Sequence, residues 1–190
     1  TSFVYTGSNI DAFKDAINNS NIISLARGSI NGDTPVLAGL LVEALKTCKD
    51  EIDSLIARGG IIMGFGNGFQ ALVRTGLIPH GTVTKPTLSF TMNENGRHVS
   101  LTHDVEKTSL NSFWLNGAPT LQSLYSSNTF GRLVGTGCAA YRYSSVNPNG
   151  SEDNVEALIS DNGQIFGRMS QVDSITIKNA LSHIRGDMNV

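Results

Sequence analysis

Residues 61–76 have the pattern of a strand, a tight turn and a helix. The apolar run Ile61–Met63 leads into alternating glycines, and a helical pattern begins at Phe69. In enzymes that use a nucleophile elbow, the residue at such a turn carries the attacking atom. Here that residue is Gly66, which has no side chain. The pattern therefore predicts the frame of a covalent-catalysis site that lacks its reactive group.

Glycine is a physically reasonable occupant of this turn. An elbow residue is often held at strained backbone angles, which cost about 1–3 kcal/mol. Glycine relieves much of that strain because it has no Cβ. An ordinary strand-to-helix turn that never held a nucleophile is the alternative interpretation, and it would be favoured if residues 61–76 stood alone.

Longer stretches of the sequence favour the first interpretation. Residues 64–72, Gly-Phe-Gly-Asn-Gly-Phe-Gln-Ala-Leu, resemble the Gly-Ile-Cys-Asn-Gly-Phe-Gln signature of the glutaminase domain of phosphoribosylformylglycinamidine synthase, a class I glutamine amidotransferase. Four further stretches resemble segments of that domain in the family's order, at 32–35, 95–100, 147–151 and 163–169. Five matches in order indicate homology and a shared fold.

The resemblance implies a Cys-His-Glu triad, in which a thiolate attacks the glutamine amide, an imidazole moves protons and a carboxylate orients the imidazole. The matching positions here are Gly66, Gln171 and Asp173. Glutamine cannot shuttle a proton near neutral pH, and Asp173 has no imidazole to orient. The family's Pro-Gly-Gly, which helps to build the oxyanion hole, is Ala-Arg-Gly at 26–28. The resemblance thus implies a degenerate copy with vestigial triad positions and a vestigial glutamine pocket at Gly28, Asn67, Gly68, Gln70 and Arg97.

Other residues that could do chemistry have simpler interpretations. Cys138 is expected to be a small buried residue that enters a strand. His98 and His103 lie five apart in a strand-like segment, so they are expected to face opposite sides and not to share a metal. The glycines at 64, 66 and 68 lack the third glycine of a dinucleotide loop, because Phe69 stands there. We expect neither a metal nor a cofactor.

The composition is that of a globular domain. The chain has 190 residues, of which 39% are hydrophobic and 16% are charged, and its net charge is -2. This balance gives no basic footprint for nucleic acid, and no apolar run approaches the roughly 20 residues that span a bilayer. Two cysteines are too few for a disulfide framework. We expect an intracellular, cytoplasmic protein with no nucleic-acid or membrane partner.

Apolar periodicity predicts alternating strands and helices in the first half of the chain. The expected helices are 9–18, 36–46, 50–58, 67–75 and 174–184; the expected strands are 2–5, 21–25, 60–65, 139–143, 155–159 and 164–169. Residues 82–109 have strand-like periodicity, and 110–136 are left unassigned. The fold class expected is α/β, with a mainly parallel central sheet flanked by helices, the flavodoxin-like architecture of class I glutamine amidotransferases, and an added antiparallel portion. The elbow would lie at the carboxyl edge of that sheet, where such folds place ligands.

Residues 1–190 are expected to form one domain, as a C-terminal fragment of a larger synthase-like protein. The first functional hypothesis is a catalytically dead domain whose partner is a synthase domain, in cis or in trans, or another protein. Two alternatives stay open. One is a residual amidotransferase domain of an active, ammonia-dependent synthase, and the other is an interaction protein like the viral tegument relatives of this synthase. A glutamine sensor that uses the vestigial pocket is a further reading, weakened by the altered loop at 26–28.

Overall fold

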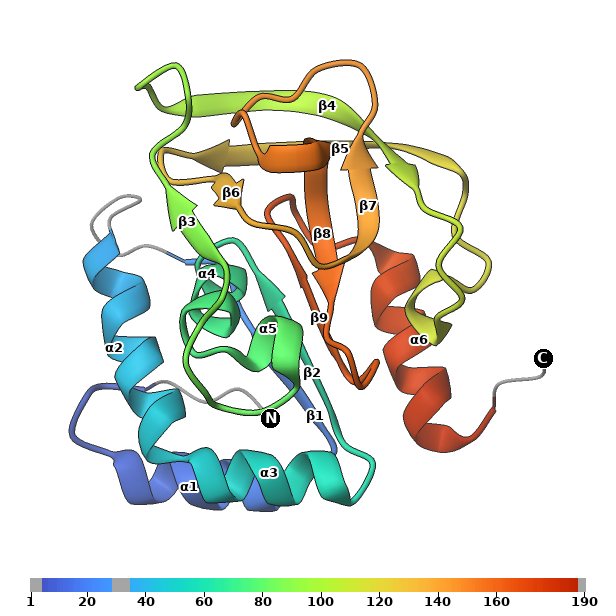
Figure 1. Ribbon diagram of the computed structural model, residues 1–190. Coiled ribbons are helices and arrows are strands. Elements are labelled where there is room, and N and C mark those ends of the chain that lie inside the picture. The colour runs from blue at the N-terminus through green and yellow to red at the C-terminus, as the bar shows by residue number, and fades with distance from the viewer. Residues whose placement is uncertain (1–4, 29–34, 188–190) are drawn as a thin grey trace.

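The computed structural model describes residues 5–28 and 35–187, apart from the side chains of residues 35–38. One sheet has seven strands in the order β1-β2-β9-β8-β7-β4-β5, and β3 pairs with β6 (Figure 1). The strands are β1 (Ile22–Leu25), β2 (Ile61–Phe65), β3 (Ser89–Thr91), β4 (Val99–Lys107), β5 (Leu121–Asn128), β6 (Arg132–Val134), β7 (Cys138–Tyr143), β8 (Val155–Ile159) and β9 (Ile165–Arg168). The helices are α1 (Ile10–Asn18), α2 (Pro35–Thr47), α3 (Lys49–Ala57), α4 (Asn67–Arg74), α5 (Leu77–His80) and α6 (Ser174–Arg185), with 3-10 turns at Phe113–Leu115 and Glu152–Asn154.

The large sheet is mixed. Strand β2 lies between β1 and β9 and runs parallel to both. The pairings of β9 with β8, β8 with β7, β7 with β4 and β4 with β5 are antiparallel. The α/β class and the added antiparallel portion are confirmed. A parallel arrangement holds only for β1, β2 and β9, because each strand beyond β9 in the sheet order runs antiparallel to its neighbour.

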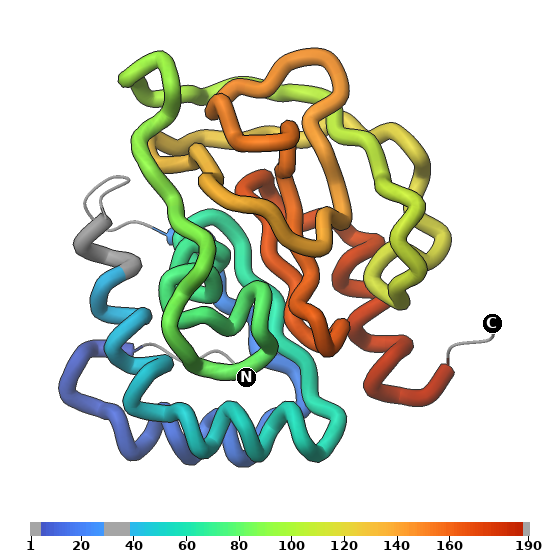
Figure 2. Tube along the Cα trace, viewed as in Figure 1, coloured from blue at the N-terminus to red at the C-terminus, as the bar shows by residue number. Residues whose placement is uncertain are grey.

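Strand β2 is the centre of two apolar layers. All five of its residues are buried, as expected for a parallel strand covered on both faces. Ile62 belongs to the core cluster that includes residues of α1 to α5. Ile61 and Met63 belong to a second cluster, which includes Trp114 and, from α6, Ala180. Figures 1 and 2 show α6 on the opposite side of the sheet from α2 and α4, with β4 and β5 across the top of the view. No helix in the described ranges is long and apolar enough to cross a bilayer.

Most predicted elements are confirmed to within one or two residues. The unassigned stretch 110–136 contains β5 and β6. Its strand signal is weak because β5 is an edge strand whose exposed positions carry Leu121, Ser123 and Tyr125 while buried positions carry Ser126 and Asn128. Of the strand expected at 2–5, residues 2–4 lie outside the described residues, and so do 32–34 of the stretch 32–35.

The prediction for Cys138 is wrong, because this cysteine is exposed. It is the first residue of β7, and the buried run of that strand begins one residue later, at Ala139. Its Sγ lies 3.9 Å from Oδ1 of Asp161 at the reversal between β8 and β9. The small apolar residues next to Cys138 in the sequence therefore do not indicate that its own side chain is buried.

Helix α4 and strand β1 approach so closely that Gly68 has no room for a side chain. A Cβ at Gly68 would lie 2.3 Å from the Leu25 carbonyl oxygen, a backbone atom that cannot rotate away. We expect Gly68→Ala to lower the free energy of unfolding by about 1–3 kcal/mol, measured by urea denaturation. The control is Gly39→Ala in α2, where the described residues place no atom from outside the helix backbone within 4 Å of the new Cβ. That change should be neutral or should stabilise by up to about 1 kcal/mol, and equal effects at the two positions would contradict the close approach.

Candidate functional site

The predicted elbow is present at the end of β2. Strand β2 ends at Phe65, Gly66 turns the chain with φ 53° and ψ -113°, and α4 begins at Asn67. This positive φ is a conformation that residues with a Cβ rarely adopt. The Gly66 amide donates to the Arg168 carbonyl across 3.0 Å, and the Gly66 carbonyl accepts from Gln70 N at 3.0 Å. The turn is thus fixed by its backbone to β9 and to its own helix.

A cavity of about 130 Å³ opens at this elbow. Its walls come from the elbow, the chain after β1, the end of β5 and the end of β9: Arg27, Gly28, Gly66, Asn67, Ser127, Asn128 and Met169. Of the residues predicted to form the vestigial pocket, Gly28 and Asn67 line this cavity, and they are joined by a 2.7 Å hydrogen bond from Asn67 Nδ2 to the Gly28 carbonyl.

The other predicted pocket residues do not line the cavity. Gly68 packs against β1, and Gln70 is buried with Nε2 donating to the Phe130 carbonyl at 2.9 Å. Arg97 lies in an exposed turn, where its backbone carbonyl accepts from Asn93 Nδ2 at 2.9 Å. Of these three residues, only Gln70 makes a side-chain contact near the elbow, and that contact is to a backbone carbonyl.

Arg27 occupies the space in front of Gly66. A Cβ built at Gly66 would lie 2.9 Å from Arg27 Cγ. The guanidinium reaches across the cavity, where Nη2 donates to the Ser127 carbonyl at 2.6 Å, and it lies 6.0 Å from the centre of the Tyr125 ring. Sequence reasoning recorded Arg27 only as a change in the oxyanion loop. No local signal in the sequence predicts this second role, because the contact joins residues that are 100 apart along the chain.

The two predicted triad positions after β9, Gln171 and Asp173, make structural contacts. Gln171 is exposed, and its backbone amide donates to the Tyr125 carbonyl at 2.9 Å. Asp173 is the N-cap of α6, where Oδ1 accepts from Thr176 N at 2.8 Å. Its Oδ2 accepts from Thr176 Oγ1 at 2.8 Å and from Arg168 Nη1 at 2.6 Å. Neither residue lines the elbow cavity.

Arg168 and Glu156 form a buried ion pair directly beside the elbow. Both side chains are 0% exposed, and Arg168 Nη2 lies 2.8 Å from Glu156 Oε2. Glu156 Oε1 also accepts from Ser170 N at 3.0 Å, and the guanidinium lies 4.6 Å from the centre of the Tyr141 ring. Burial alone would raise the pKa of Glu156, but the charge of Arg168 and the hydrogen bonds outweigh burial and hold that pKa below its usual value. The carboxylate is therefore ionised.

His103 and Ser170 form a pair that resembles a base and a nucleophile. His103 Nε2 lies 3.0 Å from Ser170 Oγ, and Ser126 Oγ lies 3.1 Å from the same oxygen. Burial lowers the pKa of His103, so its imidazole is neutral near pH 7. However, Ser170 is 0% exposed and does not line the elbow cavity. No substrate can reach this hydroxyl, and the pair is part of the core.

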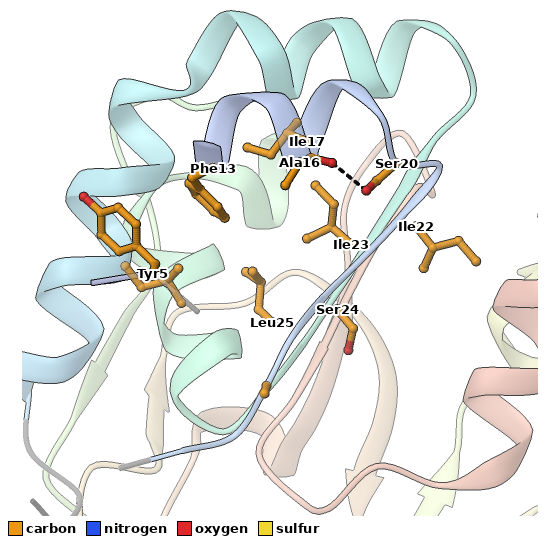
Figure 3. A pocket seen from close by; sticks show the side chains of 11 residues that line it. Tyr5, Phe13, Ala16, Ile17, Ser20, Ile22, Ile23, Ser24 and Leu25 are labelled. Atoms are coloured by element: carbon orange, nitrogen blue, oxygen red, sulfur yellow. Dashed lines mark hydrogen bonds between the residues drawn. The ribbon is translucent and has the colours of Figure 1, made fainter. Parts of the chain in front are cut away.

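A second cavity, of about 460 Å³, lies elsewhere, along β1 and α1. Figure 3 shows Phe13, Ile17 and Ile23 turned toward one another beneath α1, while Ser24 lies on the other side of β1. Tyr5 is the one titratable side chain among its lining residues. Its size alone does not make this cavity a reaction site, because its described lining residues include no carboxylate, histidine or cysteine. Among the described residues, no group of three or more His, Cys, Asp or Glu is placed to hold a metal ion.

A family model described as a CobB/CobQ-like glutamine amidotransferase domain matches residues 3–141. The chain belongs to this glutamine amidotransferase family. The matched range includes the elbow at Gly66 and Arg27, whereas Gln171 and Asp173 follow it.

This chain is similar to a subunit of phosphoribosylformylglycinamidine synthase and to solved structures of the same fold. The phosphoribosylformylglycinamidine synthase subunit PurQ of Synechococcus sp. (strain JA-3-3Ab) is 32% identical over 120 residues, which are 60% of this chain and 52% of the relative. The chain thus matches about half the length of that subunit. The fold is that of a chain in the structure of PurLQS from Thermotoga maritima, with a TM-score of 0.69, 21% identity and coverage of 95% and 96% of the two chains. The Trypanosoma brucei CTPS glutaminase domain with bound acivicin is also similar, with a TM-score of 0.63, 12% identity and coverage of 100% and 82%.

The ion pair beside the elbow makes a testable contribution to stability. Glu156→Gln leaves the buried Arg168 with Asp173 as its remaining carboxylate partner, so the free energy of unfolding should fall by about 3–5 kcal/mol. The control, Glu43→Gln, breaks an exposed pair with Lys46 and should cost about 0.5 kcal/mol or less.

The same variant should alter the pH dependence of unfolding. Because the pKa of Glu156 is lower in the folded chain, its stabilisation is complete above the usual value of 4.5 and is lost as the pH falls through the folded value. We expect wild type to lose this contribution on acidification and Glu156→Gln to lose less. Parallel pH profiles of the two proteins would contradict the assignment of an ionised Glu156.

Proposed function

We propose that this chain is a glutaminase-fold domain of the phosphoribosylformylglycinamidine synthase family that does not hydrolyse glutamine. It would act through contact with a synthase domain, in cis or in trans, or with another protein. The observation that carries the proposal is Arg27 in front of a glycine at the elbow, where the family chemistry needs a thiol. With this guanidinium in its wall, the cavity measures only about 130 Å³ and leaves little room for glutamine.

The positions of the other triad members support the same conclusion. Gln171 cannot take a proton from a nucleophile, and both oxygens of Asp173 accept hydrogen bonds from α6 or Arg168. Residual hydrolysis would need Asp173 to activate a water molecule. That carboxylate is instead committed to a helix cap and an ion pair, which makes the residual-enzyme alternative the weaker one.

The partner is proposed from the relatives. The similar subunit is named as a subunit of phosphoribosylformylglycinamidine synthase, and the similar fold occurs in a structure named PurLQS. We also propose that residues 1–190 form one domain of a larger synthase-like polypeptide, which the size of the native polypeptide on an immunoblot tests. A role in purine biosynthesis would follow from that assembly and not from chemistry at the elbow.

We expect the pure chain to release no ammonia from glutamine above the uncatalysed background, measured with a coupled ammonia assay and an active glutaminase as positive control. Loss of the whole triad in a comparable hydrolase costs about 10⁶-fold in kcat. Gly66→Cys alone should not restore activity, because Gln171 is not a base and the new Cβ would lie 2.9 Å from Arg27 Cγ. Steady ammonia release by wild type, or a stable glutamyl thioester on Gly66→Cys, would overturn the proposal.

A further inference from the structure

A second pair of a histidine and a serine lies at the surface, where β4 meets β5. His98 directly precedes β4, and its Nε2 lies 2.9 Å from Oγ of Ser127 in β5. Both members of the pair formed by His103 and Ser170 are buried. By contrast, His98 is exposed and Ser127 is half-buried. This second pair therefore lies at the boundary with solvent, where a small molecule can approach it.

Thr129 fixes the orientation of the His98 imidazole. Nδ1 of His98 lies 3.0 Å from Thr129 Oγ1. When this hydroxyl accepts the Nδ1 proton, Nε2 keeps its lone pair and can accept the proton of Ser127 Oγ. These are the roles of the orienting group, the base and the nucleophile in a catalytic triad, with a hydroxyl in place of the carboxylate.

Tyr125 supplies a hydrogen-bond donor beside the serine. It lies two residues before Ser127, on the same face of β5, and its hydroxyl lies 2.6 Å from Ser100 Oγ. Hydrogen bonds from Ser100 and Ser127 lower the pKa of this tyrosine, and the charge of Arg27 adds to the effect. A more acidic hydroxyl is a stronger hydrogen-bond donor, so it suits an oxygen that gains negative charge next to Ser127.

We propose that Ser127 is a nucleophile, activated by His98, through which the chain cleaves small carboxylic esters. Ser127 Oγ forms a bond to the ester carbonyl carbon while its proton moves to His98 Nε2. The bond from that carbon to the alcohol oxygen then breaks, and the alcohol leaves with the proton. Water attacks the acyl-serine by the same route, which releases the carboxylic acid and restores Ser127. Tyr125 donates to the carbonyl oxygen in both steps.

The inference goes beyond the proposed function and does not rest on it, because it uses neither Gly66 nor Asp173. Esters are the expected substrate class, since an alcohol leaves more readily than an amine. An exposed imidazole such as that of His98 is not sheltered from water as the harder cleavage of an amide requires. Ester cleavage at Ser127 is thus compatible with an elbow that does not hydrolyse glutamine.

The test is labelling of the full chain with a fluorophosphonate probe, followed by mass spectrometry of its peptides. The serine oxygen bonds to phosphorus, fluoride leaves, and the serine proton passes to the base. We expect an adduct on Ser127. His98→Gln should slow its formation at least about a hundredfold, because the general base is lost. The matched control is His80→Gln, which removes another exposed histidine, 3.1 Å from Thr87 Oγ1, and should leave the rate unchanged.

Hydrolysis of 4-nitrophenyl acetate tests for turnover. Wild type should release nitrophenolate over many turnovers, and Ser127→Ala should release it at the background rate. Thr129→Val removes the hydroxyl that positions His98 and should lower the rate about tenfold, the equivalent of one hydrogen bond. Thr129→Ser should restore the rate, which a loss of packing at this position would not allow.

The inference is overturned if Ser127 is not labelled, if His98→Gln and His80→Gln are labelled alike, or if Ser127→Ala hydrolyses the ester like wild type. An ammonia assay on the same sample keeps the two proposals apart. Ammonia release from glutamine would defeat the proposed function alone, and failure of Ser127 to react would defeat this inference alone.

Discussion

The buried ion pair of Arg168 and Glu156 is the interaction on which the rest of the site depends. It joins β8 and β9, the last two strands along the chain. Through Asp173 it also contacts the start of α6. The carbonyl of the same Arg168 holds the Gly66 amide. A buried guanidinium has to keep its carboxylate partners, because a lone buried charge is strongly destabilising. Asp173 is therefore held by a structural requirement that is independent of any reaction.

This constraint gives the frame of the elbow a structural basis that does not depend on catalysis. The turn at Gly66, the close contact of Gly68 with β1 and the cap at Asp173 all contribute to packing or to backbone geometry. None of them needs a thiol or an imidazole. Position 66 itself is free to be glycine, and Arg27 then occupies the volume that a larger side chain would require. The fold around the elbow can be kept without the catalytic groups, because contacts of β9 and α6 stabilise it.

The sequence could predict the elements that have strong local signals. Buried runs such as Ile61–Met63 and capped helices such as α6 came out at nearly the right bounds, and the elbow followed from glycine spacing. Strand β5 was missed because its face toward the core carries Ser126 and Asn128 in place of a continuous apolar series. The role of Arg27 could not be predicted, since it depends on a contact with Ser127 that is 100 residues away along the chain. The exposure of Cys138 was likewise not predictable, because it depends on where the buried part of β7 begins.

The most direct test of this account is the Asp173→Ala variant, which removes both the cap and the ion-pair partner, assayed for stability and for ammonia release from glutamine. As a cap and an ion-pair partner, Asp173 should contribute about 2–4 kcal/mol to the free energy of unfolding. The account predicts a loss of that size in urea denaturation and no change in ammonia release from the background level. Unchanged stability together with a fall in ammonia release would show that the carboxylate still serves catalysis, and would contradict the account.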